Sequence, residues 1–192
     1  MVVCISRILK KIVVDTNIME PIVVDLDGTL VKTDLLHESA IVYVKKNPLK
    51  SVNLLLWLLK GVDFLKKNLA EQVQLDIKNL PYNQLLLEYL ATEHKNGRIL
   101  VLATASHQIY ADQVARHLGI FSFVFATRGS LNLKGNNKLA CLLEHFGEKG
   151  FDYIGDSSAD LVIFPHAKNA ILVNPKLLKT AKKHGPVECR FS

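Results

Sequence analysis

The sequence predicts an α/β fold in which helices cover both faces of an open, doubly wound parallel sheet. Three observations carry this prediction: short apolar runs are bounded by turn residues, segments with helical periodicity lie between them, and glycine follows these segments. Continuous apolar runs are typical of strands that are buried on both faces of a parallel sheet. Their alternation with helices predicts right-handed crossovers.

The strands and helices of the predicted core follow one another in order along the chain. Strands are expected at residues 22–27, 98–106, 121–127, 151–156 and 169–175. Between them, helices are expected at 106–118, at 136–146 and, as a short segment, from Ser158. Gly119 and Gly147 follow the two longer helices directly, and glycine at this position is a common helix stop.

A long insertion separates the first two predicted strands. About seventy residues lie between Gly28 and Arg98, whereas a crossover needs only about a dozen plus turns. Helical periodicity covers residues 34–46, 50–70 with an interruption at Gly61, and 82–95; a further helix over 71–78 is an open alternative. We therefore predict an N-terminal extension (1–20), a core (21–32 and 97–192) and a small helical cap (33–96) inserted after the first core strand.

Composition limits the classes of function that are open to the chain. With 192 residues, 49% of them hydrophobic, the chain can bury a full core. The net charge of +6 is spread over lysine pairs without a nucleic-acid motif, so we expect no nucleic-acid partner; it suits an anionic ligand or an anionic membrane surface. Three distant cysteines without a CxxC pair indicate neither a disulfide framework nor a zinc site.

The N-terminus and the apolar runs bear on location. No apolar run approaches the roughly 20 residues of a membrane span. The first residues place a weak apolar start before basic residues, which reverses the order of a secretory signal. We expect a cytoplasmic protein, with peripheral membrane association as an open alternative. Met19 is a candidate true start, which would make residues 1–18 an appendage.

The segment "PIVVDLDGTL" (21–30) is the first candidate for chemistry. In a strand, Asp25 and Asp27 would point to the same face. Burying two adjacent carboxylates raises a pKa or requires a cation, so the arrangement is costly unless it serves a metal or a proton transfer. The alternative is an Asp-rich turn that merely closes a strand.

Further polar residues follow the other predicted strands. Ligands of doubly wound sheets bind at the carboxyl ends of the strands. The polar residues expected there, besides the first pair, are Thr104, Ser106, Asp156 and Asp160, with Lys134 or Lys138 contributed by the helix just before the fourth strand. Carboxylates, a hydroxyl and a lysine suit a hard cation such as Mg²⁺ together with a phosphoryl group. Asp160 could contact the metal, or it could cap a helix and orient the lysine.

Four motifs in this order resemble the haloacid dehalogenase (HAD) superfamily: "VVDLDGTL", "LATAS", "KGNNKLACLL" and "YIGDSSAD", within residues 21–175. The resemblance implies a Rossmann-like core. It implies that Asp25 is a nucleophile that forms an aspartyl-phosphate and that Asp27 is the general acid and base. Mg²⁺ would be held by Asp25, the main-chain carbonyl of Asp27 and Asp156.

The same resemblance implies that Thr104, Ala105 and Lys138 hold the phosphoryl oxygens. Lys134 remains an alternative to Lys138. The function expected is a Mg²⁺-dependent phosphatase acting on a small phosphorylated metabolite. The cap gives no readable substrate code, and the oligomeric state is open.

A finer resemblance is to the phosphatase-like domain fused ahead of membrane prenyltransferases of the UbiA family. It implies a prenyl- or sugar-linked substrate as one option, a non-catalytic partner domain of a prenyltransferase as the alternative function, and "HGPVECRFS" (184–192) as a former linker. Residues 53–67, rich in leucine and bordered by lysines, are expected to close over the active site, either as an interfacial helix region or as ordinary cap core.

Overall fold

The computed structural model describes residues 19–129 and 131–191. The expectation that residues 1–18 are an appendage concerns a segment outside these ranges. None of the helices in the described ranges combines the length and the apolar character needed to cross a bilayer.

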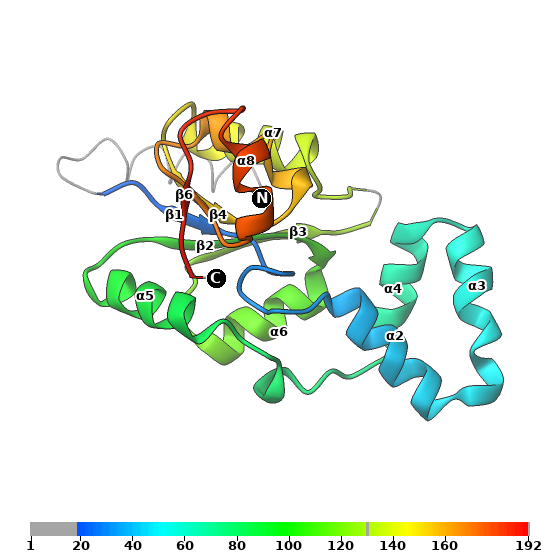
Figure 1. Ribbon diagram of the computed structural model, residues 1–192. Coiled ribbons are helices and arrows are strands. Elements are labelled where there is room, and N and C mark those ends of the chain that lie inside the picture. The colour runs from blue at the N-terminus through cyan, green and yellow to red at the C-terminus, as the bar shows by residue number, and fades with distance from the viewer. Residues whose placement is uncertain (1–18, 130, 192) are drawn as a thin grey trace.

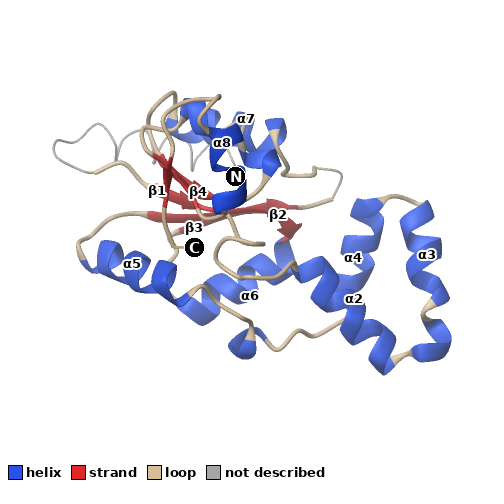
Figure 2. Ribbon diagram, in the orientation of Figure 1, coloured by secondary structure: helices blue, strands red, loops and turns tan. Residues whose placement is uncertain are grey.

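The core is a six-stranded parallel sheet, which confirms the predicted α/β class (Figures 1 and 2). The strands, in the spatial order β3-β2-β1-β4-β5-β6, are Phe123–Thr127, Leu100–His107, Ile22–Val24, Asp152–Gly155, Ala170–Leu172 and Glu188–Cys189. The chain moves from β1 to one side through β2 and β3, and then returns to the other side at β4. The strand order therefore reverses beside β1, where doubly wound sheets bind their ligands.

Alternation along the strands divides the core into two layers. Ile22 and Val24 of β1 belong to one hydrophobic cluster, while Val23 belongs to the other. The first layer includes buried leucines of α5 (Gln84–Lys95) and Val114 of α6 (Gln108–Leu118), and the second includes Leu142 of α7 (Asn136–Phe146). Figure 1 shows α5 and α6 below the sheet, with α7 and the short α8 (Leu178–Ala181) above it. Burial on both faces explains why the strands are continuous apolar runs.

The insertion after β1 is helical, as expected. It contains α2 (Leu35–Lys46), α3 (Val52–Leu59) and α4 (Val62–Gln72), with a 3₁₀ turn at Pro48–Lys50; α2, α3 and α4 are called the cap helices below. Asp34 caps α2 by accepting hydrogen bonds from the amides of Leu36 and His37. Gly61, at φ 113°, separates α3 from α4. The division into extension, core and cap stays a prediction, and we note that α5 packs on the sheet.

Three segments differ from the expected elements. The optional helix at 71–78 is absent: α4 ends at Gln72, and only a 3₁₀ turn at Ile77–Asn79 follows. The segment from Ser158 is likewise a 3₁₀ turn, Ser158–Asp160. Residues 188–189, expected to be a linker, form β6 and pair with β5. Backbone pairing at a sheet edge depends on a partner strand, so a polar segment such as this carries no apolar period to reveal it.

Candidate active site

The loop after β1 brings both aspartates of the first motif to one cavity. The strand ends at Val24, earlier than expected, so Asp25 and Asp27 belong to the loop. Both carboxylates line a cavity of about 200 Å³. Their surroundings differ: Asp25 is buried against a lysine and a second carboxylate, whereas Asp27 contacts the first turn of the cap and hydroxyls of the core. The two side chains are therefore suited to different tasks.

Asp25 lies in a buried charge cluster with Lys138. The ammonium of Lys138 donates to Asp25 Oδ1 at 2.7 Å, to the Tyr153 hydroxyl at 3.0 Å and to Asp160 Oδ1 at 3.3 Å. Lys138 lies in the first turn of α7 and is only 3% exposed. Burial raises the pKa of Asp25, and the charge of Lys138 opposes this rise. Burial outweighs the lysine, so the pKa of Asp25 lies at about 8, and a cation bound beside this carboxyl group would favour its ionised form.

Asp160 is saturated with hydrogen-bond donors. Its Oδ1 accepts from the Tyr153 hydroxyl at 2.6 Å as well as from Lys138, and its Oδ2 accepts from the Ser157 amide and hydroxyl. Burial pushes the pKa of Asp160 upward, but Lys138 and these donors outweigh it, so the pKa is lowered overall. Of its two expected roles, this arrangement favours capping the turn and orienting Lys138.

Asp27 connects the core to the cap. Its Oδ1 accepts from the Leu35 amide at 2.8 Å, in the first turn of α2. Its Oδ2 accepts from the hydroxyls of Ser106 at 2.7 Å and Thr104 at 3.1 Å. Burial raises the pKa of Asp27, while these hydrogen bonds lower it in part. A carboxyl group that has a raised pKa and lines the cavity beside the cap can donate a proton and accept it again.

Asp156 completes an acidic cluster beside the loop. Asp25, Asp156 and Asp160 each place a carboxylate oxygen within 4.8 Å of the others. The Thr29 hydroxyl lies 3.5 Å from Asp25 Oδ2 and 3.4 Å from Asp156 Oδ1, so its one hydrogen can be donated weakly to either. Burial, with the charge of Asp160, raises the pKa of Asp156 to about 6. Because Asp160 is already saturated, Asp25 and Asp156 are the pair with oxygens left to bind a cation, and hard oxygen donors fit Mg²⁺.

Gly28 makes this close approach possible. Its φ is +78°, and a Cβ at this position would lie 2.2 Å from Asp156 Oδ2. Any other side chain would therefore push the Asp156 carboxylate away, and the backbone conformation itself disfavours L-residues. The Gly-Thr turn of the first motif thus leaves room for Asp156 and supplies the Thr29 hydroxyl between the two carboxylates.

The remaining residues expected at the site lie around the same cavity. Thr104 is fully buried and accepts from the Ser106 amide at 2.9 Å. Ala105 lines the cavity, as does Lys134, which is exposed. Lys138, rather than Lys134, is the lysine in contact with Asp25. The structure brings together every site residue expected from the sequence.

Three contributors escaped the sequence reasoning. Lys66 reaches from α4 of the cap to the Ala105 carbonyl at 2.8 Å, and it lines the cavity together with Asp34. Burial lowers the pKa of Lys66. Tyr153 lies in β4 and holds Lys138 and Asp160 together. Lys66 belongs to the segment 53–67 that was expected to close over the active site, but which of its lysines reaches the cavity depends on how the cap folds back. Tyr153 is the first residue of the fourth motif, two residues before Gly155, and its position in an apolar run is typical of a core residue.

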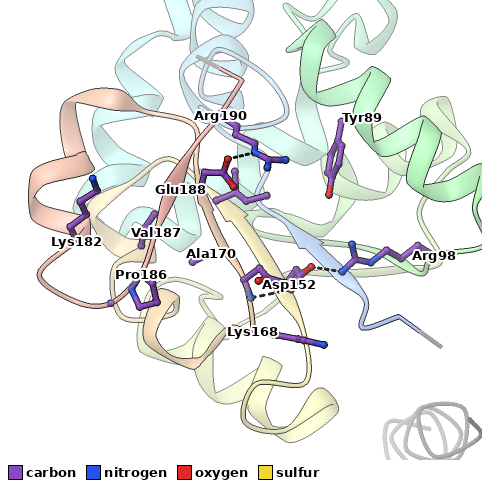
Figure 3. Close-up of a pocket in the computed structure, with 13 residues that line it drawn as sticks. Tyr89, Arg98, Asp152, Lys168, Ala170, Lys182, Pro186, Val187, Glu188 and Arg190 are labelled. Carbon is purple, nitrogen blue, oxygen red and sulfur yellow. Dashed lines mark hydrogen bonds and ion pairs between the residues drawn. The ribbon is translucent and has the colours of Figure 1, made fainter. Parts of the chain in front are cut away.

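A larger hollow of about 850 Å³ lies at the opposite ends of the strands (Figure 3). Its lining includes Asp152 and Ala170, which are the first residues of β4 and β5. Its charges are largely neutralised in place: Arg98 pairs with Asp152, and Arg190 pairs with Glu188, as the dashed lines show. Despite its size, this hollow contains neither the acidic cluster nor the lysine that the chemistry needs, so the smaller cavity is the candidate active site.

Comparisons with known proteins agree with this fold. The family model of haloacid dehalogenase-like hydrolases matches residues 22–164. The chain is similar to the uncharacterized protein y4nM of Sinorhizobium fredii (strain NBRC 101917 / NGR234), with 40% identity over 153 residues, or 80% of this chain and 30% of that protein. The match thus spans less than a third of that relative's length.

Two solved structures share the fold. One is a protein of unknown function from Bordetella pertussis Tohama I, with a TM-score of 0.64, 15% identity, and coverage of 92% of this chain and 100% of that one. The other is a phosphoserine phosphatase with a phospho-aspartyl intermediate analogue, with a TM-score of 0.60, 19% identity, and coverage of 92% and 95%. The finer resemblance to prenyltransferase-fused domains stays a prediction. The chain belongs to the haloacid dehalogenase-like hydrolase family.

Proposed function

We propose that this chain is a Mg²⁺-dependent phosphatase that hydrolyses a small phosphomonoester through an aspartyl-phosphate on Asp25. The observation that carries the proposal is the environment of Asp25. Its carboxylate is buried, lies 2.7 Å from the Lys138 ammonium and shares the cavity with Asp27. A carboxylate attacks an anionic phosphate only where positive charge offsets the approaching charges, and Lys138 supplies one such charge.

The proposed reaction divides the work between the two aspartates. An oxygen of Asp25 forms a bond to phosphorus as the ester P–O bond breaks, and Asp27 gives its proton to the leaving oxygen. Asp27 then takes a proton from a water molecule, whose oxygen attacks the phosphorus and releases phosphate and the Asp25 carboxylate. The raised pKa of Asp27 supports this role, because a proton must reside there before the first step.

Mg²⁺ would be held by Asp25 and Asp156 together with the Asp27 main-chain carbonyl, and when bound it would supply charge neutralisation for the phosphoryl group. Lys138, Thr104 and the Ala105 backbone would hold the phosphoryl oxygens. These residues border the cavity or lie directly behind it, and Lys66 would cover it from the cap. The cavity of about 200 Å³ suits a small substrate or the phosphorylated end of a larger one.

The test is a phosphatase assay across a panel of phosphorylated metabolites, with the wild type and three variants. Asp25→Asn should abolish turnover, because an amide cannot attack phosphorus. Asp27→Asn should lower kcat by about 10²–10⁴-fold, most strongly for poor leaving groups. Asp76→Asn changes an exposed aspartate outside the cavity and serves as the matched control. Turnover near the wild-type rate in Asp25→Asn would contradict the proposal, and inactivity of the wild type on every substrate would favour the non-catalytic partner domain.

A further inference from the structure

The outer surface of the cap carries an apolar face on α3. No residue of α3 is buried, although eight of the ten residues from Val52 to Gly61 are apolar or glycine. Leu59 is 76% exposed, Leu55 58%, and Leu49 in the preceding turn 95%. We call the following residues the α3 face: Leu49, Val52, Leu55, Leu56, Leu59 and Val62. A contiguous apolar surface of this kind usually marks a binding site.

The opposite side of α3 fixes the direction of this face. Trp57 packs against Tyr43 of α2 in a tilted arrangement, with ring centroids 5.1 Å apart, and the Asn53 side-chain amide donates to the Tyr43 hydroxyl at 3.2 Å. Leu54 packs against the main hydrophobic cluster. The helix is therefore held by one side, and the α3 face points away from the protein. In Figures 1 and 2, α3 is the outermost of the cap helices.

The charges around the α3 face are mostly positive. Residues 39–62 contain Lys45, Lys46, Lys50 and Lys60 and neither aspartate nor glutamate, and Asp63 is the acidic residue that follows directly. All four of these lysines are exposed. Exposed leucines bordered by lysines combine the two forces that bind an amphipathic helix to an anionic bilayer surface, namely apolar insertion and attraction to the lipid headgroups.

We propose that the α3 face docks this protein onto an anionic lipid surface, with the leucines inserted at the interface and the lysines at the headgroups. A second copy of the chain fits less well, because pairing two α3 faces would bring eight lysines together with only the two Asp63 carboxylates adjoining the faces to offset them. Nucleic acid would satisfy the lysines but would leave the leucines exposed to water. A lipid surface satisfies both.

Docking through this face is compatible with catalysis. Lys66, on the neighbouring helix α4, points to the cavity and contacts the Ala105 carbonyl, whereas the α3 face lies on the outside of the cap. None of the residues of the α3 face lines the cavity. The proposed surface therefore leaves the active site free, and its test does not depend on phosphatase activity.

The experiment is co-sedimentation of the full chain with phosphatidylcholine vesicles, with and without phosphatidylglycerol. We expect the wild type to bind the vesicles that contain phosphatidylglycerol. Leu55→Ser/Leu56→Ser should lower the partition coefficient by about tenfold or more. The matched control is Leu85→Ser/Leu131→Ser, which removes two leucines of similar exposure, 58% and 55%, from outside the cap helices and should bind as the wild type does.

A second pair of variants tests the charges. Lys50→Gln/Lys60→Gln should lower binding by about fivefold for each lysine removed, whereas Lys176→Gln/Lys182→Gln, which changes exposed lysines of the core, should not. Circular dichroism and thermal unfolding of each variant establish that it is folded. Sedimentation equilibrium of the wild type tests the second copy as occupant.

Three outcomes would overturn the proposal. The first is absence of binding by the folded wild type to phosphatidylglycerol vesicles. The second is binding that both leucine pairs, or both lysine pairs, reduce equally. The third is a dimer without vesicles that Leu55→Ser/Leu56→Ser dissociates, because the α3 face would then be covered by a second copy of the chain.

Discussion

Replacing Lys138 with methionine is expected to destabilise the fold through the two carboxylates that it leaves behind. In the wild type, the buried ammonium contacts Asp25 at 2.7 Å and Asp160 at 3.3 Å. Methionine fills a similar volume but carries no charge. Removal of one partner from a buried ion pair costs about 3–5 kcal/mol, because the remaining charge is uncompensated. For a chain of this length, that loss corresponds to a fall in Tm of about 6–20 °C.

The loss should depend on pH in a direction that the structure fixes. Burial pulls the pKa of Asp160 upward, but Lys138 and the surrounding donors lower it overall, so this carboxylate stabilises the wild type above its unfolded pKa of about 3.9. At Asp25, burial already dominates in the wild type and raises the pKa to about 8; without Lys138, burial dominates at Asp160 as well, and the folded pKa of Asp160 then lies above the unfolded one. The variant should then lose stability as the pH rises from about 4, so its deficit is largest at neutral pH and shrinks in acid.

The assay is urea unfolding, monitored by far-ultraviolet circular dichroism over a range of pH. EDTA is present to remove divalent cations, so that only the protein's own charges act on the buried carboxylates. Lys134→Met is the matched control, because Lys134 is exposed and lies four residues earlier. In the double variant Asp25→Asn/Lys138→Met, the loss should be smaller than the sum of the single losses. A deficit of less than about 1 kcal/mol in Lys138→Met, as for a surface pair, would refute the buried charge cluster.

Three further predictions concern the metal and the cap. Gly28→Ala should raise the Mg²⁺ concentration needed for activity, because the new Cβ meets Asp156. Gly97→Ala is the control: Gly97 has a similar φ of +82° but faces open space, so the Mg²⁺ requirement should not change, and equal effects of the two substitutions would contradict the steric argument. Burial raises the pKa of Asp156 to about 6, so ionisation of Asp156 lowers the stability of the metal-free protein as the pH rises through this value. Mg²⁺ binds the ionised carboxylate, so the rise in Tm that Mg²⁺ causes should increase between pH values below and above 6; a rise in Tm that is independent of pH would speak against Asp156 as a ligand. Lys66→Ala should raise KM several-fold with a smaller change in kcat, because Lys66 lines the cavity from the cap; Lys67→Ala, which changes an exposed lysine, should alter neither constant. A fall in kcat at constant KM would instead place Lys66 in the chemical step.

The sequence by itself determined the fold class and predicted most of the residues that meet at the candidate site. Strands buried on both faces must be apolar throughout, which made five of the six strands visible, although β1 ends at Val24 rather than at residue 27. The carboxyl ends of parallel strands meet at one edge, so Asp25, Asp27, Thr104 and Asp156 could be placed together from their positions after strands. These inferences rely on short-range pattern and on the topology that the pattern implies.

Only the tertiary structure decided which partner each polar group has. The choice between Lys134 and Lys138, the saturation of Asp160 by Tyr153 and Ser157, and the reach of Lys66 to the Ala105 carbonyl all depend on side-chain directions across separate elements. The short strand β6 depends likewise on a neighbour at the sheet edge. Periodicity reports which face of an element is buried, but a hydrogen bond or an ion pair between elements requires their relative positions within a few tenths of an ångström, and packing alone supplies these.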